Sequence, residues 1–224
     1  MHWFASLDPS ADAELAGLAW RLPLAYFGGA VPFGFLMCRL LKGVDLRQVG
    51  SGNIGATNAM RVLGLPLGLL AFALDVLKGY APVALLGEGD PLWQVALGAA
   101  AVVGHVWPVY LRFRGGKAVA TGFGALLAID PLIVLVAGGV WLVLLMVLGY
   151  VSVASIAMGL AFPITAASRG EPAVVIAGTS LLTLLILVRH RSNMSKLLAG
   201  TEGRTKLWHK LWRVPEAPSP DEQD

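Results

Sequence analysis

Three segments of this chain combine glycines, hydroxyl or amide side chains and basic residues between long apolar runs. The first is 50–61 (GSGNIGATNAMR), whose small residues let backbone N–H groups approach a ligand and form anion-binding nests. Arg61 adds a planar guanidinium that matches the geometry of a phosphate. We therefore predict a phosphate site here, with a flexible interfacial loop as the alternative. The candidate donors are the side chains of Ser51, Asn53, Thr57, Asn58 and Arg61.

The second segment, 112–121 (RFRGGKAVAT), places a glycine pair and a lysine directly before an expected helix. A helix N-terminus preceded by glycines suits phosphate, although the spacing is not that of a Walker A loop. Gly115, Gly116 and Lys117 are the candidates. Taken alone, the pattern is equally typical of the basic residues that flank the cytoplasmic end of a membrane helix.

The third segment is 189–202 (RHRSNMSKLLAGTE). His190 and Asn193 lie three residues apart, so in a helix they share one face. By itself this segment also fits a basic membrane anchor.

The elements that must position these segments are membrane helices. Hydrophobic residues make up 56% of the 224 positions and charged residues only 14%, whereas soluble domains carry about 25% charged residues. Apolar runs long enough to cross a bilayer predict an all-α, polytopic membrane bundle of about seven transmembrane helices. The predicted runs are 22–41, 64–86, 93–111, 118–129, 131–149, 152–167 and 172–188.

Charge predicts which ends of the helices face the cytoplasm. Basic residues follow the first, third and last apolar runs, and the opposite loops are mostly acidic. The positive-inside bias then places the N-terminus outside and the C-terminus in the cytoplasm, with all three segments on the cytoplasmic side. We expect 1–20 to be a short extracytoplasmic segment, 21–202 a single transmembrane catalytic domain, and 203–224 a cytoplasmic tail that is disordered at its end.

A few polar residues fall inside the apolar runs. Asp75 and Lys78 lie three residues apart in the second run, and an internal structural ion pair is the expected role. His105 is expected to be a packing residue. The single cysteine, Cys38, excludes a multi-cysteine metal site, and the scattered histidines give little support to any metal.

Together these segments resemble the acyl-phosphate:glycerol-3-phosphate acyltransferase family of bacterial phospholipid synthesis. Segments 50–61, 114–121 and 189–202 resemble its three signatures in order and spacing, and 75–79 (DVLKG) and 150–155 (YVSVAS) are also similar. Two departures are Ile54, where proline is often found, and Ala118, where glycine is usual. The second departure weakens any proposal that the amide of residue 118 meets phosphate in a glycine-only conformation.

The resemblance implies transfer of a long-chain acyl group from acyl phosphate to the 1-hydroxyl of glycerol 3-phosphate, giving lysophosphatidic acid and phosphate at the cytoplasmic face of the bacterial inner membrane. It implies no cofactor, no metal, no nucleic acid, and no direct use of coenzyme A or acyl carrier protein. The H-x-x-x-x-D motif of coenzyme A-dependent enzymes is indeed absent, since Tyr110, Ser195 and Val214 stand five residues after histidines.

The resemblance also implies roles for individual residues. The expected catalytic residues are Ser51, Arg61, Lys117, His190 and Asn193. The expected substrate-binding residues are Ser51, Asn53, Gly55, Thr57, Asn58, Arg61, Gly115, Gly116, Lys117, Thr121, Ser155, His190, Asn193 and Glu202. The general base is left open between a substrate phosphate and His190.

Two other functions compete with acyl transfer. A transporter of phosphorylated metabolites would also use basic, glycine-rich sites, but such sites lie near the membrane midplane and often in inverted repeats. No repeat is evident here. A purely structural membrane subunit would not need the donors of segment 50–61.

Overall fold

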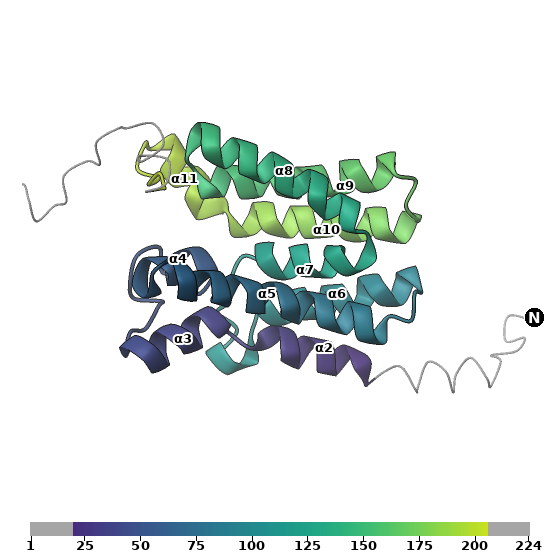
Figure 1. Cartoon of the computed structure of the whole chain (residues 1–224), viewed down its shortest axis with the longest axis horizontal. Helices are drawn as coiled ribbons and strands as arrows, with labels where there is room; N and C mark the ends of the chain where they lie inside the picture. Colours follow the sequence, from purple (N-terminus) through teal and green to yellow (C-terminus); the bar gives the residue numbers. More distant parts are fainter. Residues whose placement is uncertain (1–19, 206–224) are drawn as a thin grey trace, which may run out of the picture. The chain divides into compact units, whose positions relative to one another are not determined.

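The computed structural model describes residues 20–205 and divides the chain into two compact units, 1–131 and 132–224. Every regular element in the described part is helical (Figure 1). The elements of unit 1 are α2 (Arg21–Ala30), α3 (Phe33–Lys42), α4 (Ala56–Leu63), α5 (Leu65–Leu86), α6 (Pro91–Val106), the 3₁₀ helix η1 (Val109–Leu111) and α7 (Val119–Ile129). Those of unit 2 are α8, which starts at the boundary (Pro131–Leu148), α9 (Val151–Ser168), α10 (Ala173–Arg189) and α11 (Arg191–Leu198).

All seven predicted apolar runs are helical. Among the described residues, five helical stretches are long and apolar enough to cross a membrane, and α10 with α11 forms a sixth candidate bent by 52°. The run at 118–129 is α7, which has only 11 residues. The membrane class and the helical fold are confirmed; the number of crossings and their direction stay predictions.

The first predicted span is broken at Pro32. Proline lacks an N–H and forces the preceding residue out of the helical region, and Val31 accordingly has ψ of 116°. The Val31 carbonyl accepts from Phe33 N across a tight turn (3.2 Å) and from the Lys78 ammonium (2.8 Å). Lys78 also pairs with Asp75 at 2.7 Å, which confirms the expected internal ion pair. The pair therefore ties α5 to the break between α2 and α3.

The short helix α7 is held by close backbone contact with α5. A Cβ on Gly79 would clash with the backbone of Thr121, and one on Gly124 would clash with the backbone of Val76. Reciprocal glycines of this kind let two membrane helices approach closely, which compensates for the short apolar face of α7.

In unit 2, α9 and α10 form an antiparallel pair. The Thr183 hydroxyl on α10 donates to the Gly159 carbonyl on α9, so both helices are fixed at the same depth. α8 is linked to α9 by a hydrogen bond from Trp141 to Ser155. The chain after α11 returns to the α8–α9 turn, where Thr205 N donates to Gly149 O at 2.9 Å.

Candidate functional site

The loop before α4 is organised by the Asn58 side chain. Asn58 is buried, and its Nδ2 donates to the carbonyls of Leu46, Val49 and Asn53, each at 3.0 Å. Its Oδ1 accepts from Ser51 N at 3.1 Å. An amide with two N–H groups shared among three carbonyls has no donor left for a ligand. The structure therefore gives Asn58 a role in shaping the loop, and its expected contact with substrate stays a prediction.

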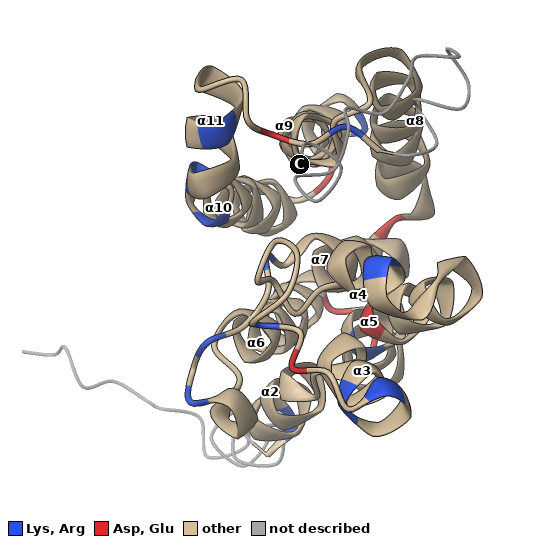
Figure 2. Ribbon diagram, turned by 90° about the vertical axis from the view of Figure 1, so that its left-hand side faces the viewer, with Lys and Arg blue, Asp and Glu red and all other residues tan. Residues whose placement is uncertain are grey.

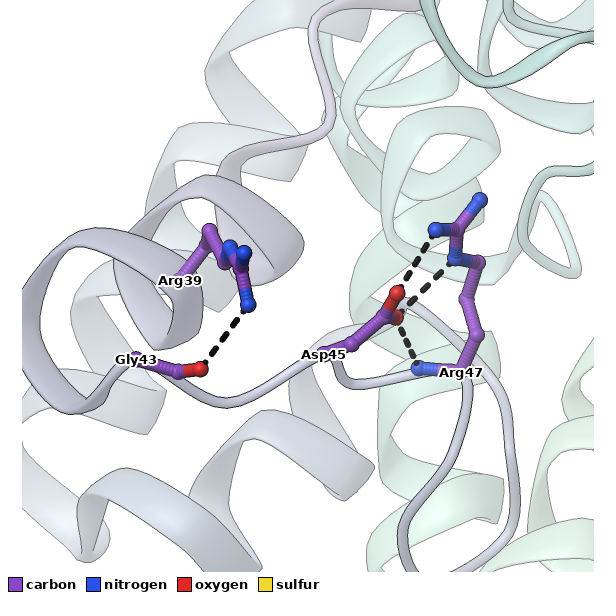
Figure 3. A network of polar contacts seen from close by, with 4 residues as sticks. All are labelled: Arg39, Gly43, Asp45 and Arg47. Atoms are coloured by element: carbon purple, nitrogen blue, oxygen red, sulfur yellow. Dashed lines mark hydrogen bonds and ion pairs between the residues drawn. The ribbon is translucent and has the colours of Figure 1, made fainter.

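The acidic residue of this loop is neutralised locally. The Asp45 carboxylate accepts from Arg47 N, Nε and Nη2 at 3.0, 3.0 and 2.6 Å, and Arg39 donates to the Gly43 carbonyl (Figure 3). The Arg47 guanidinium lowers the pKa of Asp45 to about 2. Asp45 is therefore ionised and already paired, so it does not compete with an incoming phosphate for other cations of the loop.

Three predicted ligand groups of the first segment are on the surface of this loop and helix. Ser51, Thr57 and Arg61 are exposed, and Arg61 forms no ion pair with any residue between 20 and 205. Asn53 accepts from Gly55 N at 2.8 Å, which orders the turn just before α4. The segment thus presents hydroxyls and a guanidinium on a scaffold fixed by its two asparagines.

The glycine pair of the second segment caps the C-terminal end of α6. Gly116 N donates to His105 O and Gly115 N to Val106 O, both at 3.1 Å. These carbonyls belong to the last turn of α6, where no intrahelical N–H reaches them. The two amides are therefore hydrogen-bonded to the end of α6, and the expected contact of the glycine pair with phosphate stays a prediction.

The backbone just before α7 has a left-handed conformation at Ala118. This residue is buried and has a φ of 67°, which glycine takes without strain and alanine does not. The usual glycine at this position therefore has a conformational reason. Thr121, one turn on, is fully buried, and its hydroxyl has no hydrogen-bond partner among the described residues.

Arg61 and Lys117 lie toward the same end of unit 1. α5 packs against both α6 and α7. In the chain, α6 follows α5 and runs back in the opposite direction, so α5 and α7 run in the same direction (Figure 1). Arg61, in α4, precedes the start of α5, and Lys117 precedes the start of α7. Unit 1 thus brings the first two predicted segments to one end of its helices. Basic positions also lie on α3 and in the loops around it (Figure 2).

Unit 2 gathers the remaining predicted residues in the same manner. Ser155 is near the start of α9 and His190 follows the end of α10, so both lie on the same side of the Thr183–Gly159 contact in this antiparallel pair. His190 is buried, and its Nδ1 is 2.9 Å from Ile186 O. A carbonyl only accepts, so Nδ1 carries the hydrogen in this contact.

Two side chains of the predicted set are oriented by neighbours. Asn193 Nδ2 donates to Glu202 Oε1 at 2.7 Å, so Glu202 fixes the orientation of the Asn193 amide. Trp141 Nε1 donates to Ser155 Oγ at 3.2 Å. Indole is only a donor, so Ser155 accepts from it and keeps its own O–H for another acceptor. Trp141 was not anticipated, because nothing in the spacing of the sequence links positions 141 and 155.

The residues that follow the third segment contact the turn between α8 and α9 within unit 2. The Arg204 guanidinium lies over the Tyr150 ring at 5.1 Å, beside the Thr205–Gly149 hydrogen bond. Basic positions are seen on α11 (Figure 2). Ser152, which the sequence did not single out, is a buried hydroxyl with no hydrogen-bond partner in the described range. The expectations for 1–19 and 206–224 lie outside the described residues.

Comparison with known proteins identifies the family. The profile of the glycerol-3-phosphate acyltransferase family matches residues 19–200. This chain belongs to that family. A glycerol-3-phosphate acyltransferase of Syntrophotalea carbinolica is 44% identical over 186 residues, covering 81% of this chain and 94% of the relative. One from Trichlorobacter lovleyi is 42% identical over 194 residues, covering 85% and 98%.

A solved family member has the same fold. It is described as PlsY (YgiH), an integral membrane glycerol 3-phosphate acyltransferase, in its glycerol 3-phosphate form. It is 38% identical, with a TM-score of 0.83 over 88% of this chain and 99% of that one. Its lysophosphatidic acid form gives a TM-score of 0.81. The family and the integral membrane fold expected from the sequence are therefore confirmed.

Proposed function

We propose that this chain transfers an acyl group from a long-chain acyl phosphate to the 1-hydroxyl of glycerol 3-phosphate at the cytoplasmic face of the bacterial inner membrane. The products are lysophosphatidic acid and inorganic phosphate. The observation that carries the proposal is the likeness, over 88% of the chain, to an integral membrane acyltransferase solved in a glycerol 3-phosphate form. The absence of the H-x-x-x-x-D motif supports acyl phosphate, in place of an acyl thioester, as the donor.

The electrostatics of unit 1 suit two anionic reactants. Glycerol 3-phosphate and acyl phosphate repel one another, so the site must hold fixed positive charge near both. Arg61 and Lys117 supply it from the same end of unit 1, and Asp45 is neutralised by Arg47. We assign Ser51, Asn53 and Arg61 to glycerol 3-phosphate, and Gly55, Thr57, Lys117 and Thr121 to the donor phosphate. Gly115 and Gly116 shape the loop that carries Lys117.

Within unit 2, the family resemblance assigns Ser155, His190 and Asn193 to glycerol 3-phosphate. Ser155 keeps its O–H for an acceptor such as a phosphate oxygen, because Trp141 occupies one of its lone pairs. His190 has its Nδ1–H fixed on Ile186 O, which orients the imidazole ring, and we assign this ring to a substrate hydroxyl. Asn193 is set by Glu202.

The reaction is a direct displacement. The 1-hydroxyl oxygen attacks the acyl carbonyl carbon, the bond from that carbon to the phosphate oxygen breaks, and the hydroxyl proton passes to a substrate phosphate or to His190 Nε2. Phosphate is a good leaving group, so charge stabilisation by Lys117 and Arg61 is the main demand on the protein. No acyl-enzyme is needed.

The deciding experiment uses the full chain purified in detergent. With palmitoyl phosphate as donor, we expect phosphate release that requires glycerol 3-phosphate and matches the lysophosphatidic acid formed, measured by mass spectrometry. Palmitoyl-coenzyme A and palmitoyl-acyl carrier protein should give no product. Lys117→Ala and Arg61→Ala should each lower kcat/KM by on the order of a hundredfold or more. Product from either thioester, or near-normal transfer by these variants, would overturn the proposal.

A further inference from the structure

The loop that carries Lys117 is folded back onto the end of α6. Besides the amides of Gly115 and Gly116, which cap the last turn of α6, Phe113 N donates to Pro108 O at 2.9 Å. The backbone at 115–116 therefore contacts His105 and Val106, the last two residues of α6, and Pro108 just beyond it.

One side chain of α6 faces this backbone. A Cβ built on Gly116 would clash with the His105 ring, and its three nearest atoms, Nε2, Cε1 and Cδ2, all belong to that ring. The imidazole is 5% exposed, so it has little room to move aside. On its other side, Nδ1 lies 3.9 Å from Asp75 Oδ1, whose carboxylate pairs with Lys78.

Gly115 meets α6 differently. A Cβ there would approach the carbonyl oxygens of His105 and Val106 and the Cδ of Pro108. Two of these three atoms belong to the backbone, and substitution of the His105 side chain would not move any of them. The two neighbouring glycines are therefore excluded from bearing a side chain by different parts of the same helix end.

We propose that His105 is a positioning residue for acyl transfer. Its ring, which is buried between Asp75 and the loop, sets the path of the backbone at 116 and so the place of Lys117. In this view residue 116 is glycine because the imidazole occupies the space of a side chain, and not because a phosphate requires it. This role of His105 goes beyond the proposed function and rests on it only for the activity readout.

The consequence for catalysis follows from covalent adjacency. A side chain at 116 must push either the His105 ring or the loop, of which residues 112–114 are exposed. Displacement of the reacting groups by about 1 Å can cost roughly a hundredfold in rate. Because Lys117 is assigned to the donor phosphate, the loss should appear in kcat and in the KM for acyl phosphate, with the KM for glycerol 3-phosphate unchanged.

The test is a double-mutant cycle on the full chain in detergent. Gly116→Ala alone should lose on the order of tenfold to a hundredfold in kcat/KM for palmitoyl phosphate. His105→Asn keeps an amide near the Nδ1 position but removes Nε2 and Cε1, and should cost a few-fold. The Gly116→Ala/His105→Asn protein should then be within about threefold of His105→Asn, because coupled neighbours are not additive.

Gly115→Ala provides the matched control. Its clash is with backbone carbonyls, so in combination with His105→Asn the two losses should multiply. The midpoint of thermal unfolding is measured without substrate. His105→Asn should restore the midpoint lowered by Gly116→Ala, but not the midpoint lowered by Gly115→Ala. If Gly116→Ala alone does not fold, the recovery of folded protein in the double variant replaces its rate.

Three results would overturn the proposal. The first is that the losses in kcat/KM caused by Gly116→Ala and His105→Asn multiply in the double variant, as those of Gly115→Ala and His105→Asn should. The second is that folded protein is not recovered in the double variant. The third is that Gly116→Ala raises the KM for glycerol 3-phosphate as much as the KM for acyl phosphate. The loss would then not be due to displacement of Lys117. The unfolding midpoints separate failure of this inference from failure of the proposed acyl transfer, because they need no substrate.

Discussion

The buried pair of Asp75 and Lys78 makes the sharpest prediction about stability. The two side chains are 3% and 4% exposed and 2.7 Å apart. At an effective dielectric constant of about 20, Coulomb's law gives an attraction of about 6 kcal/mol, which desolvation of both charges reduces. Removal of one partner of such a pair typically costs about 3–5 kcal/mol, because the other charge stays buried.

The perturbation is Lys78→Met, Asp75→Leu, and the two together. We expect each single change to lower the free energy of unfolding by about 3–5 kcal/mol, and the double change to lower it by clearly less than their sum, with a coupling energy of about 3 kcal/mol. A deficit should remain in the double variant, because Val31 O loses the charged donor that now reaches it at 2.8 Å. Hydrogen bonds from charged groups are worth about 1.5–3 kcal/mol.

The assay is unfolding of the purified chain by sodium dodecyl sulfate titration in mixed micelles. The control cycle uses the ion pair of Arg21 with Glu88, whose carboxylate side chain is 64% exposed. Exposed pairs couple by about 0–1 kcal/mol, so Arg21→Met and Glu88→Gln should add almost independently. If the Asp75 and Lys78 changes were additive to within about 0.5 kcal/mol, the pair would not interact as described.

Further predictions concern the loop and the two oriented side chains. Asn58→Asp replaces two donors with acceptors facing backbone carbonyls, so it should lower kcat/KM more than Asn58→Ala, by on the order of tenfold or more, in the palmitoyl phosphate assay. Trp141→Phe keeps the ring but removes the indole N–H, so it should raise the KM for glycerol 3-phosphate several-fold, because Ser155 loses its fixed orientation, with unfolding little changed. The pKa of Asp45 is lowered to about 2 from the ordinary 3.8, so its pairing should persist above pH 4 and be lost only as the pH falls through about 2. Carboxyl NMR titration should show this midpoint, and Arg47→Gln should move it toward 3.8.

Local patterns in the sequence were sufficient for the class, the helices and the family. Every predicted apolar run is helical, the first of them as two helices, because a chain in lipid must satisfy its backbone hydrogen bonds internally. The pairing of Asp75 with Lys78 was also accessible, since positions three apart share a helix face. The three signatures were recognisable because their residues are contiguous, and the match over residues 19–200 confirms the family that they indicated.

The roles of several residues were decided only by tertiary structure. The spacing of segment 50–61 suggested that Asn58 binds substrate, whereas the fold surrounds its amide with three carbonyls. The glycine pair at 115–116 suggested phosphate-binding amides, whereas the return of the loop onto α6 gives those amides to His105 O and Val106 O. In both cases the hydrogen-bond partner is a backbone carbonyl. Every residue carries one, so the sequence does not show which carbonyl a given amide will meet.

The sequence by itself indicated the apolar helical runs, the pairing of Asp75 with Lys78, and the family. Only the tertiary structure decided that Lys78 reaches across to the broken helix at Val31, that Trp141 orients Ser155, and that a histidine ring lies against Gly116. The physical reason is the separation along the chain over which each interaction acts. Helix formation and hydrophobic burial depend on neighbours within a few positions, whereas a hydrogen bond or a steric exclusion between helices depends on which surfaces pack together.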